Sequence, residues 1–248
     1  MLFVDHYNPE RSSAPPVSAH IPTRHADTIP LEAAFTLAGV FAERIRRSPD
    51  ALAYRQYDTA RDIWEDWTWA EAGRQAARWR SALKSEGLQP GDRVAIMLNN
   101  CREWHCFDLA AQSLGLVTVP LYTNDRPDNV AYILTHADAR LLLLGNADQW
   151  DNLKDCLRGI AGLQRIFTLE PVSRDRDAPT PVADWLPPDS AAFEADPLDP
   201  DALATIMYTS GTTGFPKAVV LTHHNILNNA WFSAQAMHFT EQDRLCVP

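Results

Sequence analysis

One short run of residues sets the fold class of this 248-residue chain: Arg93-Val94-Ala95-Ile96-Met97-Leu98. The run is apolar after its first residue and follows the turn Gln89-Pro90-Gly91-Asp92. An apolar run this short, bounded by turn residues, is typical of a strand that is buried on both faces, as in a parallel sheet. We therefore expect a parallel β-sheet in which residues 93–98 form one strand.

The segments on either side of this run alternate between helical and strand patterns. Upstream, Thr68 and Glu71 have the spacing of a capping box, for a helix that ends at Gly87. Downstream, the patterns predict helices over 103–114, 127–137 and 148–158, and strands over 116–121, 140–144 and 164–169. Strands that alternate with helices form βαβ units, so the sequence predicts an α/β fold with a largely parallel sheet.

Four segments lie outside this alternation. Residues 1–30 contain five prolines without periodicity, and we expect an extended lead-in there. From Leu31 to Ile45 the apolar spacing predicts an amphipathic helix. Residues 170–201 are rich in Pro and Asp, which predicts a solvated connector. Residues 244–248 are expected to begin a buried strand.

Composition excludes several classes of function. The chain has 22 Lys and Arg against 32 Asp and Glu, a net charge of −10, which disfavours general binding to nucleic acid. Its four cysteines form neither a dense disulfide framework nor a paired C-x-x-C motif. Cys101 and Cys106 are five residues apart and do not share a helix face, so we expect no metal site. Neither a signal peptide nor a bilayer-spanning stretch is recognisable, and we expect a cytoplasmic protein.

The residues best suited to binding and catalysis follow an apolar strand, Leu203-Ala204-Thr205-Ile206-Met207-Tyr208. They are Thr209-Ser210-Gly211-Thr212-Thr213-Gly214-Phe215-Pro216-Lys217. The two glycines let successive backbone N–H groups face one concavity, and four hydroxyl groups add further donors. Lys217 adds a positive charge that a phosphate group can use. This pattern predicts an anion-binding loop.

Two other interpretations of the loop remain open at this point. By composition alone it is equally a plain turn rich in Thr and Gly. A P-loop phosphotransferase is less favoured, because Lys217 stands three residues after Gly214 and no helix is expected to begin at Lys217.

As an ordered string, residues 208–217 resemble the signature loop of the adenylate-forming (AMP-binding) superfamily of acyl-CoA synthetases, luciferases and adenylation domains. The match continues through Val219-Val220-Leu221-Thr222-His223-His224-Asn225. Residues 91–95, 103–104 and 119–127 resemble the long-chain fatty acyl-CoA synthetase branch. The resemblance covers residues 31–248 and implies the N-terminal part of an AMP-binding domain.

The resemblance implies a two-step reaction with ATP, Mg²⁺ and coenzyme A. A fatty carboxylate displaces pyrophosphate from ATP, and coenzyme A then displaces AMP to give a thioester. By the same resemblance, Lys217 is the catalytic residue and the cofactor-binding residues are Thr209, Ser210, Gly211, Thr212, Thr213, Gly214 and Lys217. The family usually has Gly where this chain has Ala218, a change that is nearly neutral if the position lies in a strand. His223 and His224 are expected to serve helix entry or packing.

The family's motifs for adenine, ribose and Mg²⁺, and its small C-terminal domain, have no counterpart before Pro248. We therefore expect the 248 residues to hold half a nucleotide site and to be inactive alone. An acyl-adenylate ligase that loads a carrier protein and a non-catalytic binding fragment remain alternatives. The acyl chain length and the oligomeric state stay open, and a peripheral contact with membranes is compatible with a fatty acid substrate.

Overall fold

A computed structural model describes residues 27–172, 177–209 and 215–246 of the chain. The expected extended lead-in therefore lies almost wholly outside the described residues. A short 3-10 helix, Leu31–Ala33, comes first. The helices and strands that follow are α1 (Leu37–Arg47), β1 (Leu52–Asp58), β2 (Ile63–Thr68), α2 (Trp69–Ser85), β3 (Arg93–Met97), α3 (Arg102–Ser113), β4 (Val117–Pro120), α4 (Pro127–His136), β5 (Ala139–Leu144), α5 (Ala147–Leu157), β6 (Arg165–Thr168), β7 (Thr180–Pro181), α6 (Val182–Trp185), β8 (Leu203–Thr209), β9 (Lys217–Thr222) and α7 (His223–Ala236).

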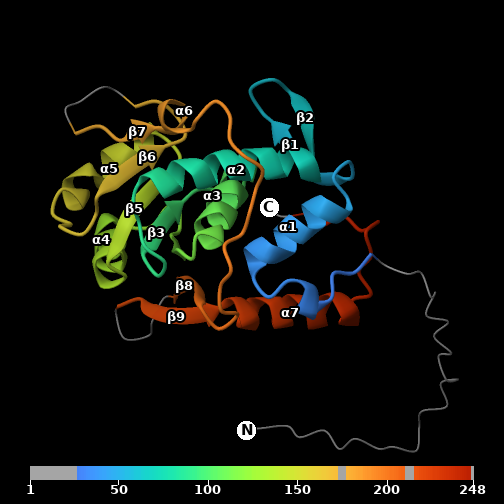
Figure 1. Cartoon of the computed structure of the whole chain (residues 1–248). Helices are drawn as coiled ribbons and strands as arrows, with labels where there is room; N and C mark the ends of the chain where they lie inside the picture. Colours follow the sequence, from blue (N-terminus) through green and yellow to red (C-terminus); the bar gives the residue numbers. More distant parts are fainter. Residues whose placement is uncertain (1–26, 173–176, 210–214, 247–248) are drawn as a thin grey trace, which may run out of the picture.

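The centre of the molecule is a seven-stranded sheet with the order β7-β6-β5-β3-β4-β8-β9 (Figure 1). The neighbouring strands are parallel, except that β9 runs antiparallel to β8. This confirms the predicted α/β fold with a largely parallel sheet. It also confirms β3, whose observed bounds end one residue before the predicted strand.

Helices cover both faces of the sheet, and the residues of β3 alternate between them. Val94 and Ile96 pack with side chains of α2 and α3, including Trp79 and Phe107. Ala95 and its neighbours on the opposite face pack with α4 and α5. Both sets are fully buried, which explains why the strand reads as a continuous apolar run rather than an alternating one. The two faces hold the main hydrophobic cores.

The start of α2 is fixed by the predicted capping box. The Thr68 hydroxyl accepts a hydrogen bond from the Glu71 backbone N–H at 3.2 Å, and the Glu71 carboxylate accepts one from the Thr68 N–H at 2.7 Å. Gly87, with φ +71°, follows the end of the helix in the left-handed region that glycine favours. Both predicted boundaries of this helix are confirmed.

The first helix begins later than the spacing from Leu31 predicts. Ala34 is extended, and Thr36 caps α1 by accepting a hydrogen bond from the Gly39 N–H at 3.0 Å. The cap satisfies a backbone donor that has no partner within the helix, so α1 starts at Leu37. The predicted helix is correct from Leu37 onward, whereas residues 31–33 form a separate 3-10 helix and residues 34–36 interrupt the two.

The antiparallel hairpin β1–β2 was not predicted. Its strands are largely half-buried or exposed and lack the clean alternation that marks a strand in the sequence. The hairpin packs against the start of α3, where the Arg102 guanidinium lies 4.1 Å from the centre of the Trp67 ring and donates to the Glu65 carboxylate at 2.6 Å. Tertiary contacts therefore hold it in place.

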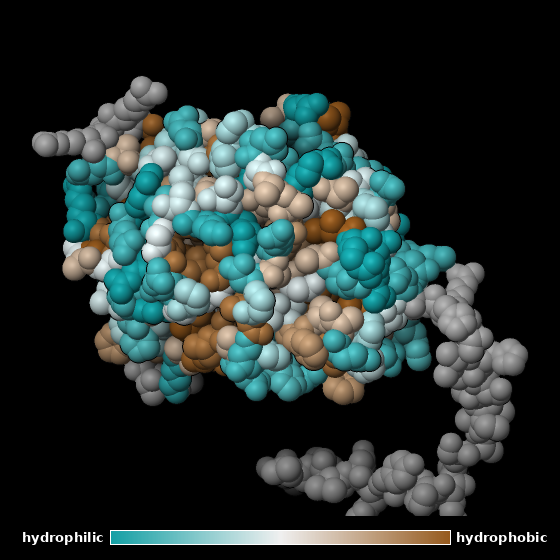
Figure 2. All heavy atoms as spheres, viewed as in Figure 1, coloured by the Kyte–Doolittle hydropathy of each residue, from teal (hydrophilic) through white to brown (hydrophobic). Residues whose placement is uncertain are grey.

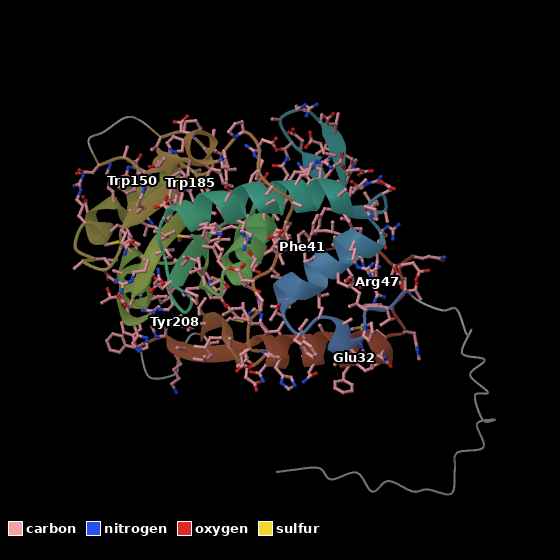
Figure 3. The ribbon with its side chains drawn as sticks, viewed as in Figure 1. Glu32, Phe41, Arg47, Trp150, Trp185 and Tyr208 are labelled. Carbon is pink, nitrogen blue, oxygen red and sulfur yellow. The ribbon has the colours of Figure 1, made fainter. Side chains whose placement is uncertain are left out.

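The segment 170–201 differs from the predicted solvated connector, because it contains β7 and α6 and packs against the rest of the molecule. Trp185 stacks on Phe167 of the sheet at 4.2 Å, and Phe193 contacts Phe41 of α1 edge to face at 5.1 Å. The Asp196 carboxylate accepts a hydrogen bond from Arg80 at 2.6 Å. Figure 3 labels Trp185 of this segment and Phe41, the partner of Phe193.

The last described residues do not form the predicted buried strand. Residues 244–246 are exposed and have no regular structure.

Exposed apolar side chains occur on the edge strand β9, at Val219 and Val220. Figure 2 shows hydrophobic residues gathered over this edge of the sheet. None of the described helices has the length and apolarity that crossing a bilayer requires.

Candidate phosphate-binding site

The two described ends of the predicted anion-binding loop lie opposite each other. Thr209 is the last residue of β8 and Lys217 is the first of β9, and the two are register partners in the antiparallel pair. Both residues are exposed. The residues between them that were assigned to the cofactor, Ser210, Gly211, Thr212, Thr213 and Gly214, lie outside the described residues. The structure therefore brings Thr209 and Lys217 together and leaves the roles of all seven residues as a prediction.

The position of the loop in the sheet is one at which α/β proteins bind ligands. Strand β8 is parallel to β4, and β4 is parallel to β3, so the carboxyl ends of these strands face the same edge. Thr209 stands at the carboxyl end of β8. Ligands of open α/β sheets bind outside the carboxyl ends of the strands, which supports a binding role for the residues that follow Thr209.

The side chain of Lys217 is available to an anion. The side chain is exposed and makes no ion pair with any described residue. Many arginines in the same part of the chain do form ion pairs with carboxylates. An ammonium group on a flexible stem can approach a phosphate as a point charge.

Ala218, where the family usually has Gly, is an ordinary strand residue. It pairs with Tyr208 in the β8–β9 register, and its φ is not positive. A methyl group at such a position carries no backbone strain. The strand position expected for Ala218 is confirmed.

The elements after the loop argue against a P-loop phosphotransferase. In a P-loop the helix begins directly at the Lys, so that its N-terminus faces the phosphates. Here Lys217 begins the strand β9, and α7 begins only at His223. Thr222 caps that helix in a capping box with Asn225. The loop therefore joins two strands of one hairpin.

The two histidines at the start of α7 lie where a packing role was expected. His223 is fully buried, its Nδ1 accepts a hydrogen bond from the Leu37 backbone N–H at 3.4 Å, and burial lowers its pKa. His224 is exposed, with its Nδ1 3.1 Å from the Asp201 carboxylate. Neither contact involves Thr209 or Lys217. His223 links α7 to the start of α1.

The described residues contain no group of three or more His, Cys, Asp or Glu side chains that could hold a metal ion. Cys101 stands at the N-cap of α3 and Cys106 is buried inside it. Burial raises the pKa of both thiols, that of Cys101 to about 11. Metal ligation requires thiolates, so this environment opposes it.

Sequence reasoning missed two side chains of α4 that contact both described ends of the loop. A hydrogen bond of 2.7 Å joins His136 Nδ1 to the hydroxyl of Tyr208, the residue before Thr209. Tyr132 packs on Phe215, two residues before Lys217, with ring centres 5.2 Å apart. The i, i+4 spacing of Tyr132 and His136 places them on one helix face, but their partners are some 80 residues away in the sequence, so no local pattern reveals the contact.

A shallow surface depression of about 490 Å³ lies on the same face of α4. It is lined by Asp128, Ala131, Tyr132, Thr135 and His136. Tyr208 itself is buried; Figure 3 labels it at β8. Aromatic side chains of α4 thus lie against both described loop ends.

Residues 41–248 match the family described as AMP-binding enzyme, and the chain belongs to this family. It is 31% identical over 214 residues to the acyl-CoA ligase sidI of Aspergillus fumigatus, covering 80% of this chain and 36% of that protein. It is 30% identical over 215 residues to the long-chain-fatty-acid–CoA ligase FadD13 of Mycobacterium tuberculosis, covering 83% of this chain and 39% of that protein.

Solved structures share the fold. ATP-bound MatB from Rhodopseudomonas palustris is 27% identical to the chain with a TM-score of 0.68, over 84% of this chain and 38% of that one. The chain thus spans less than two fifths of the length of these relatives. The matched region corresponds to the N-terminal part of the AMP-binding domain, as the resemblance implied.

Proposed function

We propose that residues 209–217 bind the β- and γ-phosphates of ATP in an acyl-CoA ligase that activates a long-chain fatty acid. The cofactor-binding residues of this proposal are Thr209, Ser210, Gly211, Thr212, Thr213, Gly214 and Lys217, and Lys217 is also the catalytic residue. A cytoplasmic location with peripheral contact to membranes belongs to the same proposal.

The observation that carries the proposal is the pairing of Thr209 with Lys217 at the loop end of the β8–β9 hairpin. It places an exposed hydroxyl and an exposed ammonium group on the two strands that enclose the Gly- and Thr-rich stretch. The similarity to MatB, which was solved with ATP bound, supports a nucleotide as the ligand.

The proposed chemistry explains why donors are needed at this place. A carboxylate oxygen of the fatty acid bonds to the α-phosphorus while the bond to the β-phosphate oxygen breaks, and pyrophosphate leaves with the added negative charge. Donors fixed beforehand around the departing phosphates stabilise that charge without having to reorient during the reaction. The thiolate of coenzyme A then bonds to the acyl carbon, and AMP leaves.

In this proposal magnesium is present only as the ion bound to ATP. The described residues offer no cluster of carboxylates or histidines that fits a metal ion. We therefore assign no magnesium ligand among them and route no step through the ion.

Coenzyme A is proposed as the acceptor because the curated relatives sidI and FadD13 are both acyl-CoA ligases by name. A long-chain fatty acid is proposed from the FadD13 relationship and from the resemblance of residues 119–127.

A loop exchange tests the proposal. Residues 208–222 of this chain replace the matched segment of FadD13, and formation of long-chain acyl-CoA is measured against the parent enzyme. We expect the chimera to retain kcat within about 10-fold, and Lys217→Met in the chimera to lower kcat by at least about 100-fold, the usual effect of losing one transition-state donor.

A chimera with Val219→Ile serves as the matched control, because it changes an exposed strand residue next to the same loop. Thermal melting establishes that each chimera folds. A folded chimera without ligase activity, or one in which Lys217→Met has no effect, would contradict the proposed role of the loop.

A further inference from the structure

Helix α4 holds an aromatic pair that touches the chain on both sides of the phosphate-binding stretch. Tyr132 and His136 are one helical turn apart, and their rings stack with centres 5.4 Å apart and an interplanar angle of 23°. Each ring has a further partner in the β8–β9 hairpin. We call the four residues Tyr132, His136, Tyr208 and Phe215 the α4 clamp.

The first contact of the α4 clamp fixes the end of β8. The Tyr208 hydroxyl is hydrogen-bonded to His136 Nδ1 at 2.7 Å, and the two rings meet edge to face with centres 5.8 Å apart. Tyr208 is buried, so its ring has little freedom to move. Thr209 follows directly in the chain, next to this anchored residue.

The second contact fixes the approach to β9. Phe215 is 66% exposed, yet its ring packs on Tyr132 at 5.2 Å with an interplanar angle of 37°. Pro216 separates Phe215 from Lys217, and its ring restricts the backbone between them. The contact at Phe215 therefore lies two residues before Lys217, across a backbone with restricted freedom.

We propose that Tyr132 and His136 are positioning residues that hold Thr209 and Lys217 in register for phosphate binding. The inference rests on the proposed function of the loop. The proposal assigns no nucleotide contact to Tyr132 or His136. Both act through their contacts with Phe215 and Tyr208. The exposed Phe215 ring packs against the protein surface because Tyr132 of α4 is an aromatic partner. Aromatic pairs stabilise the folded state by more than their buried area accounts for.

Hydrogen–deuterium exchange on the 248-residue chain tests the clamp without any ligand. The amides of Thr209, Lys217 and Ala218 report on the end of the hairpin, where Thr209 pairs with Lys217. We expect Tyr132→Leu and His136→Leu to speed exchange at these amides about 3- to 10-fold, the range that corresponds to losing one aromatic pair or hydrogen bond.

Conservative variants separate positioning from general stability. Tyr132→Phe keeps the ring, and His136→Asn keeps a hydrogen-bonding atom near the place of Nδ1, so both should exchange like the wild type. Thr135→Ala, which changes an exposed residue between them that lines the same depression, is the matched control. Amides of β3 and β5 should be unaffected in every variant. Because His136 is exposed, we expect its variants to fold even if those of Tyr132 do not.

Titration with inorganic tripolyphosphate then connects the clamp to binding. We expect the two Leu variants to bind about 3- to 10-fold more weakly than the wild type, with rescue in Tyr132→Phe and His136→Asn. Unchanged exchange in both Leu variants would overturn the proposal, as would equal binding by all variants. If exchange rises as expected but the wild type binds no polyphosphate, the clamp stands as a positioning device and the proposed function of the loop fails.

Discussion

Asp108 makes the folded chain sensitive to pH in a direction that the structure specifies. It lies in α3, where its Oδ1 accepts a hydrogen bond from Gln112 Nε2 at 2.8 Å. Burial raises the pKa of the carboxyl group from its ordinary value of 3.8 to about 6, against the opposing effect of hydrogen bonds from Thr118 and Gln112. At about 1.4 kcal/mol for each pH unit, this difference corresponds to about 3 kcal/mol.

The sign follows from proton binding. Between pH 4 and 6 the folded state holds a proton at Asp108 that the unfolded state has already lost, so stability falls as the pH rises through this range. The destabilisation of the folded state by the ionised Asp108 carboxylate is fully present above pH 6. Asp108→Asn removes the charge and keeps the oxygen that Gln112 Nε2 donates to. We expect it to raise the free energy of unfolding by about 1–3 kcal/mol at pH 8 and by almost nothing at pH 4.

Urea unfolding of wild type and Asp108→Asn at pH 4, 6 and 8 measures this gain. Asp50→Asn, a change at an exposed position, is the control and should alter stability by less than about 0.5 kcal/mol at every pH. A destabilised Asp108→Asn at pH 8, or a gain of equal size at all three pH values, would refute the reasoning.

Three further substitutions test the fold, each by urea unfolding at pH 7. Thr68→Ala removes the hydroxyl of the capping box with Glu71 and should cost about 1 kcal/mol; no loss would mean that the box does not stabilise α2. Leu143→Ala empties a fully buried position in the sheet and should cost about 2–5 kcal/mol, whereas a cost under about 1 kcal/mol would show that the core is loosely packed there. Gly115→Ala should cost about 1–2 kcal/mol, because φ is +73° and the added Cβ would lie 3.1 Å from two side chains. Gly159→Ala, where φ is not positive and the nearest atom lies at 3.8 Å, should be nearly neutral, and equal losses at the two glycines would argue against strain.

The sequence predicts those parts of the fold whose signals are local. The apolar runs of β3 and β5 are short and bounded by turns, and the capping box at Thr68 is a contact between residues three apart. Such features are complete within a few residues. They place the sheet, most of its helices and the boundary of α2 correctly.

The parts that were missed depend on contacts between distant segments. Trp185 and Phe193 are isolated aromatic residues in a Pro-rich stretch, and only the folded chain shows that they pack on Phe167 and Phe41. The start of α1 was placed too early because Ala34 continues the helical spacing although its backbone is extended. Apolar periodicity cannot detect that change of conformation.

The candidate site also has one part that a local sequence pattern predicts and one part that depends on contacts between distant segments. The order of residues 208–217 identifies the loop, since the family signature is a continuous string. Tyr132 and His136 have no place in that string, because they reach the loop through side-chain contacts of α4.

Titration of the 248-residue chain with MgATP and with tripolyphosphate, in parallel with Lys217→Met and Lys84→Met, tests the central claim most directly. Both variants remove one exposed ammonium group, but only Lys217 stands at the loop. We predict measurable, weak binding by the wild type and by Lys84→Met, and binding at least about 10-fold weaker by Lys217→Met. Absence of binding by the wild type, or equal affinities of all three proteins, would contradict the claim that residues 209–217 bind phosphate.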